Sequence, residues 1–295
     1  MTLLTTFAAF FGLVMLLGMV NDNAATCTGS DADRVYYCKT FQKDYSEGTK
    51  TLIFEERNVG LINSTVFSSP TLKSVVTLTL TGSKIRTIES GAFEQFSSLI
   101  TLELQNNKLT TLSPSWFHDS TVLEQLNVAG NVIHQLRPGM LEGYSGLKVL
   151  NLSRNEIVSI ESGSFATLSK LSSLDLSYNR ISSLERKVFT SMNATLKLHG
   201  NPWNCSCEQK DFILFLQELV NASRLNDSTL VTCHYPPDLN GMIVWNVSEV
   251  NCSASVLSPP STKIFHKIVL PALFVVLGEC VFLPRQIGSL LCLCP

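Results

Sequence analysis

The stretch LKVLNLSRNEI, residues 147–157, has a spacing of apolar residues that recurs along the chain. Counted from Leu147, leucine or isoleucine stands at positions 1, 4, 6 and 11, and asparagine stands at position 9. This spacing is neither the stripe of an amphipathic helix nor the strict alternation of a half-buried strand. It indicates an internal repeat, so copies are sought before any secondary structure is assigned.

Copies of the stretch begin at intervals of 24 residues. The regular copies start at Val75, Leu99, Leu123, Leu147 and Leu171. Degenerate copies start at Thr49 and Asn193, so that seven units cover residues 49–203. Each regular unit has two further apolar residues, three and eight places beyond position 11. These pairs are Ile88 and Phe93, Leu112 and Phe117, Leu136 and Leu141, Ile160 and Phe165, and Leu184 and Phe189.

One such unit cannot bury its own apolar face, but a stack of seven makes one continuous core. Each buried leucine or phenylalanine contributes about 1.5–3 kcal/mol, so the stack is stable only as a whole. The asparagine at position 9 can bond backbone groups of neighbouring turns. It is seen as Asn107, Asn131, Asn155 and Asn179. Arg57 and Ser83 hold this place in the first two units, which predicts a weaker asparagine ladder there.

The repeats resemble the extracellular leucine-rich repeat family in its typical 24-residue form. The resemblance implies an α/β-type repeat solenoid, a curved horseshoe with parallel strands on its concave face and disulfide-stabilised caps. In that family the variable residues between the leucines point outward from the strands and bind ligand. Their equivalents, the candidate ligand-binding residues, are Thr77, Thr79, Thr101, Glu103, Gln105, Gln125, Asn127, Val149, Asn151, Ser173, Asp175 and Lys197.

Cysteines flank the repeats on both sides, where a solenoid needs caps over its exposed core. Disulfides let a small cap keep its shape without a large core. Cys27 and Cys38 precede the repeats, although the family often has four cysteines there. Behind the repeats, four cysteines alone allow three pairings. Their order after NPW resembles the family's C-terminal cap, whose pairing would join Cys205 to Cys233 and Cys207 to Cys252.

Two other interpretations bear on this C-terminal cap. A zinc site is the alternative to disulfides, but the one-residue spacer of CSC is shorter than the usual two to four. Apolar residues at helical spacing after the CSC motif predict a helix that lies over the last coil. These residues are Phe212, Phe215, Leu216 and Leu219.

The ends of the chain and its sequons indicate the secretory route. Residues 3–20 are an uncharged apolar run, which predicts a signal peptide over residues 1–25, with an uncleaved anchor as the alternative. Candidate N-glycosylation sites, each an Asn-x-Ser/Thr without proline, are Asn63, Asn151, Asn193, Asn221, Asn226 and Asn246. Two more sequons, Asn204 and Asn251, adjoin cap cysteines that restrict access.

The expected order of segments ends in a hydrophobic tail. We expect a signal peptide at 1–25, an N-terminal cap at 26–48, repeats at 49–203, a C-terminal cap at 204–252, a stalk at 253–267 and the tail at 268–295. The tail resembles a glycolipid-anchor signal, although Arg285 interrupts it. A single-pass helix is the alternative and must accept Lys267 and Glu279. Both alternatives place the protein at the cell surface, and a secreted form is the third.

Nucleic-acid binding and catalysis find no support in the sequence. The formal net charge of −2 offers no basic footprint for DNA or RNA. The five histidines are scattered without metal-ligand spacing, and neither a Gly-rich phosphate loop nor a GxSxG motif occurs. We therefore expect no catalytic residue, no metal and no cofactor.

The resemblance implies a function in binding. Relatives of this kind include variable lymphocyte receptors, Toll-like receptor ectodomains and leucine-rich serum glycoproteins. The expectation is an extracellular recognition or co-receptor protein, with a role in innate immunity, that binds a protein or glycan ligand through the concave face and works with a membrane co-receptor. The alternative is an adhesion or matrix protein that uses the repeats as a protein-binding scaffold, and self-association would distinguish it.

Overall fold

The structure, a computed structural model, describes residues 27–54, 58–189 and 192–247. The predicted signal peptide, stalk and hydrophobic tail lie outside these residues, as does Cys252. Within the described ranges, no helix has the length and apolar character needed to cross a membrane.

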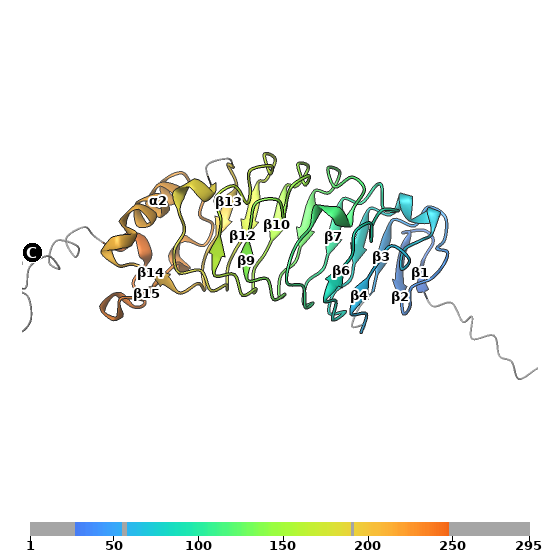
Figure 1. The fold of residues 1–295 in the computed structure, drawn as a ribbon, viewed down its shortest axis with the longest axis horizontal. Helices are drawn as coiled ribbons and strands as arrows, with labels where there is room; N and C mark the ends of the chain where they lie inside the picture. Colours follow the sequence, from blue (N-terminus) through green and yellow to red (C-terminus); the bar gives the residue numbers. More distant parts are fainter. Residues whose placement is uncertain (1–26, 55–57, 190–191, 248–295) are drawn as a thin grey trace, which may run out of the picture. The chain divides into compact units, whose positions relative to one another are not determined.

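A nine-stranded sheet runs through the repeats in the order β1-β2-β3-β5-β7-β8-β10-β12-β13 (Figure 1). Its strands are β1 (Cys27–Ser30), β2 (Val35–Cys38), β3 (Thr51–Ile53), β5 (Thr77–Thr79), β7 (Thr101–Glu103), β8 (Gln125–Asn127), β10 (Val149–Asn151), β12 (Ser173–Asp175) and β13 (Thr195–Lys197). β1 and β2 pair antiparallel, and every later pair is parallel. The strands from β3 to β13 stand one in each predicted unit, which confirms the parallel repeat solenoid.

The strand register aligns equivalent positions of neighbouring units. Leu150 of β10 pairs with Leu126 of β8 on one side and with Leu174 of β12 on the other. All three leucines are at most 1% exposed. The residue on either side of each leucine points to the opposite face, because side chains alternate along a strand. Position 4 of every unit therefore faces the core, and positions 3 and 5 face outward.

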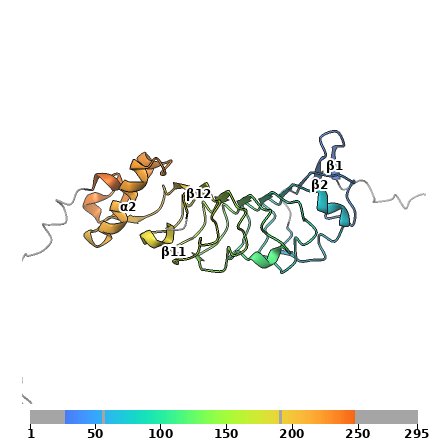
Figure 2. The ribbon, with the colours of Figure 1, turned by 90° about the horizontal axis from the view of Figure 1, so that it is seen from above.

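The return path of each unit consists of turns, short strands and 3-10 helices. The short strands pair as β4 (Leu61–Ile62) with β6 (Thr87–Ile88), and β9 (Gln135–Leu136) with β11 (Ser159–Ile160). The 3-10 helices are η1 (Pro70–Ser74), η2 (Pro114–Trp116) and η3 (Arg186–Phe189). Figure 2 shows η2, in green, on the side away from the large sheet.

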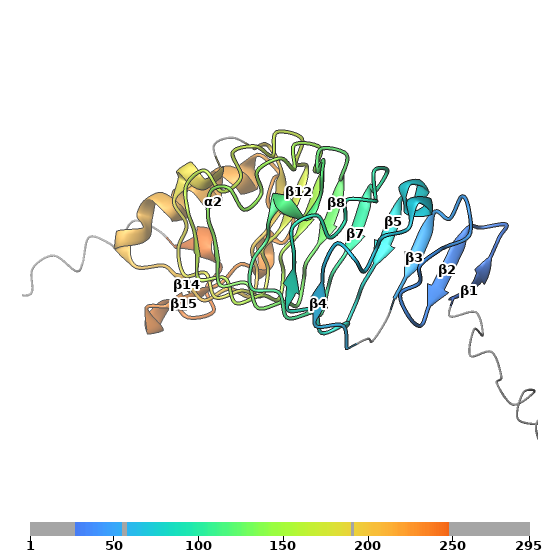
Figure 3. The same ribbon diagram turned by 45° about the vertical axis from the view of Figure 1, so that its right-hand side comes forward.

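The phenylalanines at the second apolar place pack against each other in two pairs of neighbouring regular units, as the repeat pattern predicts, and Leu141 holds the place between the pairs. The ring centroids of Phe93 and Phe117 are 5.3 Å apart, and those of Phe165 and Phe189 are 6.3 Å apart. Each of the four side chains is at most 8% exposed. The coils that carry them lie side by side in Figure 3. The core is therefore shared between units.

The asparagine ladder is confirmed. The Asn155 Nδ2 group donates to the carbonyl oxygens of Leu152, in its own unit, and Val128, in the preceding unit, both at 3.0 Å. Its Oδ1 atom accepts a hydrogen bond from Ile133 N at 3.1 Å. The same pattern recurs at Asn107, Asn131, Asn179 and Asn201.

At the N-terminal end this ladder is weaker, as predicted. Ser83 donates only within its own unit, to the Thr81 carbonyl oxygen at 3.3 Å. Arg57, which holds the same place in the first unit, lies outside the described residues. The first units therefore depend more on their apolar contacts and on the cap.

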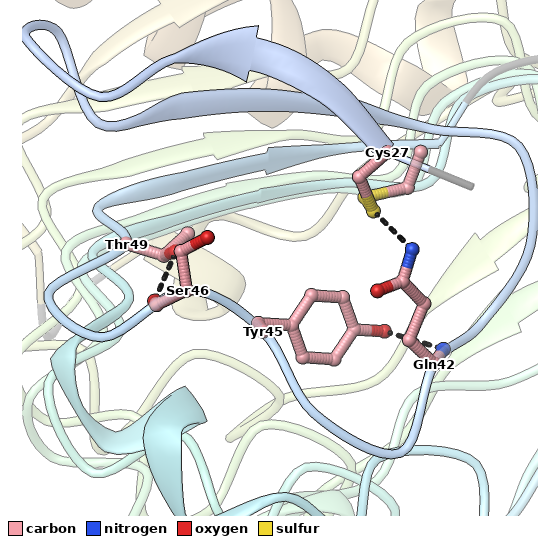
Figure 4. Close-up of a disulfide and its surroundings, with 6 residues drawn as sticks. Cys27, Gln42, Tyr45, Ser46 and Thr49 are labelled. Atoms are coloured by element: carbon pink, nitrogen blue, oxygen red, sulfur yellow. Dashed lines mark hydrogen bonds between the residues drawn. A yellow bond between two sulfur atoms is a disulfide. The ribbon is translucent and has the colours of Figure 1, made fainter. Parts of the chain in front are cut away.

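The N-terminal cap covers the open end of the core. Its predicted disulfide joins Cys27 and Cys38 across the hairpin of β1 and β2. Gln42 Nε2 donates to Cys27 Sγ at 3.1 Å, and Gln42 N donates to the Tyr45 hydroxyl at 3.1 Å (Figure 4). The ring of Phe41 then packs 4.9 Å from that of Phe54 in the first unit.

The C-terminal cap is built around α2 (Lys210–Asn221), which the helical spacing predicts. The four residues that define this spacing are at most 7% exposed, and the Phe215 ring stacks 5.5 Å from that of Phe189. The predicted bond between Cys205 and Cys233 is present. Cys207 is also disulfide-bonded, and its predicted partner lies outside the described residues. The remaining elements are β14 (Trp203–Asn204), β15 (Cys233–Tyr235), η4 (Cys207–Gln209), η5 (Ser228–Leu230), η6 (Pro237–Leu239) and η7 (Val244–Asn246).

Candidate functional site

The predicted ligand-binding residues lie in rows across the large sheet. We call this surface the strand face and define it by positions 3, 5 and 7 of each unit. Strand pairing aligns the position-3 residues Thr77, Thr101, Gln125, Val149, Ser173 and Thr195. It also aligns the position-5 residues Thr79, Glu103, Asn127, Asn151, Asp175 and Lys197. Gln105 belongs to the position-7 row with Thr81, Ala129, Ser153, Ser177 and His199.

These rows differ in how far their side chains reach solvent. Gln125, Val149 and Lys197 are exposed, and Val149 is a hydrophobic residue with 37% of its surface accessible. The other predicted residues on the three rows are half-buried. Gln105 is among them, and its Oε1 atom has no hydrogen-bond partner within the described residues.

Three residues of the position-5 row have a structural role that the sequence does not reveal. Asn127 Oδ1 accepts a hydrogen bond from Ala129 N at 3.1 Å, and Asn151 Oδ1 accepts one from Ser153 N at 3.0 Å. Asp175 Oδ1 accepts one from Ser177 N, also at 3.0 Å. These bonds close the turn that follows each strand. The three side chains are therefore partly engaged before any ligand arrives.

The residue at position 8, directly after the strand face, has positive φ in six successive units. We call these residues the turn row. They are Gly82 (65°), Asn106 (59°), Gly130 (68°), Arg154 (55°), Tyr178 (54°) and Gly200 (69°). Glycine adopts this conformation without steric cost, and asparagine tolerates it better than most residues. The recurrence of glycine at the same place in three units is the sequence signal that could have revealed the row.

Asp227 binds backbone groups just after β13, at the C-terminal edge of the large sheet. Sequence reasoning missed this residue. In the other units the backbone after a strand bonds the next unit, as Leu176 N does to Lys197 O. β13 is the last strand of the described sheet, and on its far side Leu196 forms an isolated bridge with Leu225.

Asp227 Oδ2 accepts hydrogen bonds from Leu198 N and His199 N, each at 2.7 Å, and lies 2.5 Å from His199 Nδ1. The aspartate is 8% exposed. Its carboxylate takes the place of the missing neighbour and ties the C-terminal cap to the repeats.

The predicted glycosylation sites fall into two groups. Asn193, Asn221, Asn226 and Asn246 are exposed. Asn63 and Asn151 are half-buried, and the Oδ1 atom of Asn63 accepts hydrogen bonds from both N and Oγ1 of Thr65. Asn151 stands in the middle of the position-5 row. A sugar there would cover the central strands and direct binding to the flanks or the C-terminal cap, whereas an unmodified Asn151 leaves the central units available.

Two surface hollows lie away from the strand face, and the described residues form no cluster of metal-binding side chains. Among the described residues, no group of three or more His, Cys, Asp or Glu side chains could hold a metal ion. One surface hollow of about 530 Å³ lies between η3 and α2. Another of about 460 Å³ lies beside the N-terminal cap, next to Phe41 and Val59. Neither hollow is lined by a strand-face residue.

Comparisons with known proteins agree with this geometry. The family model described as leucine rich repeat matches residues 73–133, 121–181 and 145–202. A search of curated protein sequences finds no match. Among solved structures, the chain is similar to human 5T4, a trophoblast glycoprotein also called Wnt-activated inhibitory factor 1. The TM-score is 0.61 at 22% identity, over 79% of this chain and 99% of that one.

Proposed function

Because this chain is a leucine-rich repeat protein, we propose that it is an extracellular recognition or co-receptor protein that binds a protein or glycan ligand through the strand face. The observation that carries this proposal is the in-register alignment of outward side chains on seven parallel strands, β3 to β13. At about 4.8 Å per strand, the face is roughly 30 Å long, which suits an interface of standard size. An immune role and a membrane co-receptor belong to the same proposal.

The chemistry of the face favours many weak polar contacts over a few deep anchors. Threonine, serine, asparagine and glutamine dominate its rows. Lys197 Nζ lies 3.4 Å from Asp175 Oδ2, so charges on the face are partly neutralised by each other. A polar face of this kind adapts to a hydrated ligand, and bridging waters add to the direct hydrogen bonds.

The binding test uses the purified full chain, multimerised and fluorescently labelled, on a panel of cell lines. Gln125 and Val149 are exposed and adjacent on the face, so their joint replacement by alanine removes surface contacts without touching the core. Alanine at Asn127 or Asp175 would be a poorer choice, because it would also remove a turn hydrogen bond. We expect the double variant to lose binding while its melting temperature stays unchanged.

Val158→Ala is the matched control, because Val158 is 50% exposed and lies outside the strand face. This control should bind as the parent does. Equal loss of binding in the control and in the double variant would remove the strand-face proposal. Self-association of the purified chain, measured by sedimentation, would favour the adhesion or matrix alternative.

Surface anchorage through the tail is a further part of the proposal, and it has its own test. An epitope tag inserted between Ala32 and Asp33 would sit in the exposed turn between β1 and β2. Cells that display the tag are then treated with phosphatidylinositol-specific phospholipase C. Release of the tag into the medium identifies a glycolipid anchor, and retention identifies a spanning helix. Tag that is never found at the surface or in the medium would contradict an extracellular location.

A further inference from the structure

Two residues of the turn row have side chains that their backbone conformation disfavours. Arg154 has a φ angle of 55° and Tyr178 one of 54°, while Gly82, Gly130 and Gly200 hold the equivalent places in other units. A large side chain at positive φ is strained relative to glycine. Since glycine satisfies the same turn elsewhere in this chain, the turn itself does not require arginine or tyrosine.

The two side chains form a platform that its surroundings hold in place. The Arg154 guanidinium carbon lies 4.5 Å from the centroid of the Tyr178 ring. That ring meets His199 edge to face, with centroids 4.7 Å apart. His199 is in turn fixed by Asp227. A Cβ atom at Gly200 would come within 2.6 Å of the Tyr178 ring, so glycine at this place leaves the room that the ring occupies.

The platform is open to solvent and carries an unneutralised charge. Tyr178 is 47% exposed, and Arg154 is exposed as well. Lys197 and Arg180 of nearby units lie 3.4 Å from the carboxylates of Asp175 and Glu156. Within the described part of the chain, Arg154 has no such carboxylate partner. Its guanidinium therefore keeps its donors for a ligand while the tyrosine holds it in place.

We infer that Arg154 and Tyr178 bind an aspartate or glutamate side chain of a protein partner. Guanidinium donates two parallel hydrogen bonds to a carboxylate, and the exposed tyrosine ring offers area for the apolar residues beside it. Arginine and tyrosine are among the residues that dominate binding energy at protein interfaces. This inference rests on the proposed function and refines it, because the platform borders the strand face that the partner would cover.

The test uses two synthetic peptides as probes and saturation-transfer NMR with the full chain. One acetylated pentapeptide amide carries glutamate between two phenylalanines with glycine at both ends, and the other carries glutamine in its place. We expect the glutamate peptide to bind about tenfold more tightly than the glutamine peptide, as for a hydrogen bond to a charged group. Arg154→Gln should reduce the affinity for the glutamate peptide to that for the glutamine peptide, and Val158→Ala should leave both affinities unchanged.

Sialyllactose, which presents a carboxylate on a sugar, separates a glycan from a protein partner. Binding of sialyllactose without binding of the glutamate peptide would overturn the inference, as would equal binding of the two peptides or no binding of either. Binding that persists in Arg154→Gln would overturn it as well.

Arg154→Gly separates a role in binding from a role in folding. Glycine relieves the backbone strain at this turn, so we expect this variant to lose peptide binding while its melting temperature stays the same or rises. A clearly lower melting temperature would show that Arg154 is retained for stability and would overturn the inference. Cell binding that Arg154→Gln leaves intact and the Gln125/Val149 double variant abolishes would refute this platform alone and leave the proposed function standing.

Discussion

Replacing Asn155 by alanine tests whether the asparagine ladder stabilises the repeats as the structure implies. The asparagine is 6% exposed, and its side chain makes four hydrogen bonds to backbone groups: it accepts from Ile133 N and donates to the carbonyl oxygens of Val128, Leu152 and Ser153. Alanine would leave the Ile133 N–H group buried without a partner, since Asn155 Oδ1 is its acceptor. The carbonyl oxygens of Val128 and Leu152 are less affected, because Val128 O also accepts a hydrogen bond from Asn131 and Leu152 O also accepts one from Asn179.

The magnitude follows from these bonds. A buried, unpaired donor costs about 1–3 kcal/mol. The hydrogen bonds lost at the carbonyl oxygens and the lost side-chain volume add to this cost, so we expect the free energy of unfolding to fall by about 3 kcal/mol. Asn155→Asp should lower the free energy of unfolding more than Asn155→Ala does. It keeps an acceptor for Ile133 N but places a carboxylate oxygen against the carbonyl oxygens of Val128 and Leu152, which no longer receive a hydrogen from it.

The assay is urea denaturation of the purified full chain, with its disulfides intact, followed by circular dichroism. Asn240→Ala is the matched control, because Asn240 is exposed in the C-terminal cap. The control should unfold at the urea concentration of the parent. An unfolding midpoint of Asn155→Ala equal to that of the parent, or a milder effect of aspartate than of alanine, would show that the ladder does not stabilise the repeats in this way.

Substitutions at three further residues have definite expected outcomes. Leu150→Asp places an unpaired charge where the side chain is 0% exposed, so we expect no folded protein in a secretion assay. Asp227→Ala leaves Leu198 N and His199 N without their acceptor at the edge of the sheet, which should lower the free energy of unfolding by about 2 kcal/mol in urea titrations, and Asp227→Asn should lower it less. Burial raises the pKa of Tyr144, so its neutral hydroxyl stabilises the fold below pH 10 and this contribution is lost as pH rises further. Tyr144→Phe should lower the free energy of unfolding by about 1 kcal/mol at neutral pH. In melting experiments at increasing pH, this variant should lose less stability above pH 10 than the parent.

Periodic features of the molecule could be predicted from the sequence because each is repeated. The leucine at position 4 and the asparagine at position 9 recur at fixed intervals, so a single misread unit does not hide them. The spacing of Phe212 and Phe215 predicted α2 for the same reason, since a helix repeats its own period. The buried core and the asparagine ladder could therefore be predicted from the sequence alone.

Features that occur once could not be predicted in this way. Asp227 meets Leu198 only because the chain turns back after α2, and no second aspartate repeats that contact. The turn row could be predicted only in part, because Arg154 and Tyr178 interrupt its pattern of glycines. The candidate ligand-binding rows are implied by the resemblance to extracellular leucine-rich repeat proteins, but the turn hydrogen bond of Asn127 depends on a side-chain rotamer that the repeat does not specify.

A sugar placed on the strand face would block ligand binding through this surface. Thr79→Asn creates the sequon Asn-Leu-Thr at residues 79–81 on the strand face, and Ser162→Asn creates Asn-Gly-Ser at residues 162–164, on the turn after β11. Both variants are multimerised and applied to the cells that the parent chain binds, after a mobility shift with endoglycosidase has shown that each new site carries its sugar. The account predicts that the sugar at residue 79 abolishes binding and that the sugar at residue 162 does not. Undiminished binding by the Thr79 variant would contradict this prediction, whatever the Ser162 variant does.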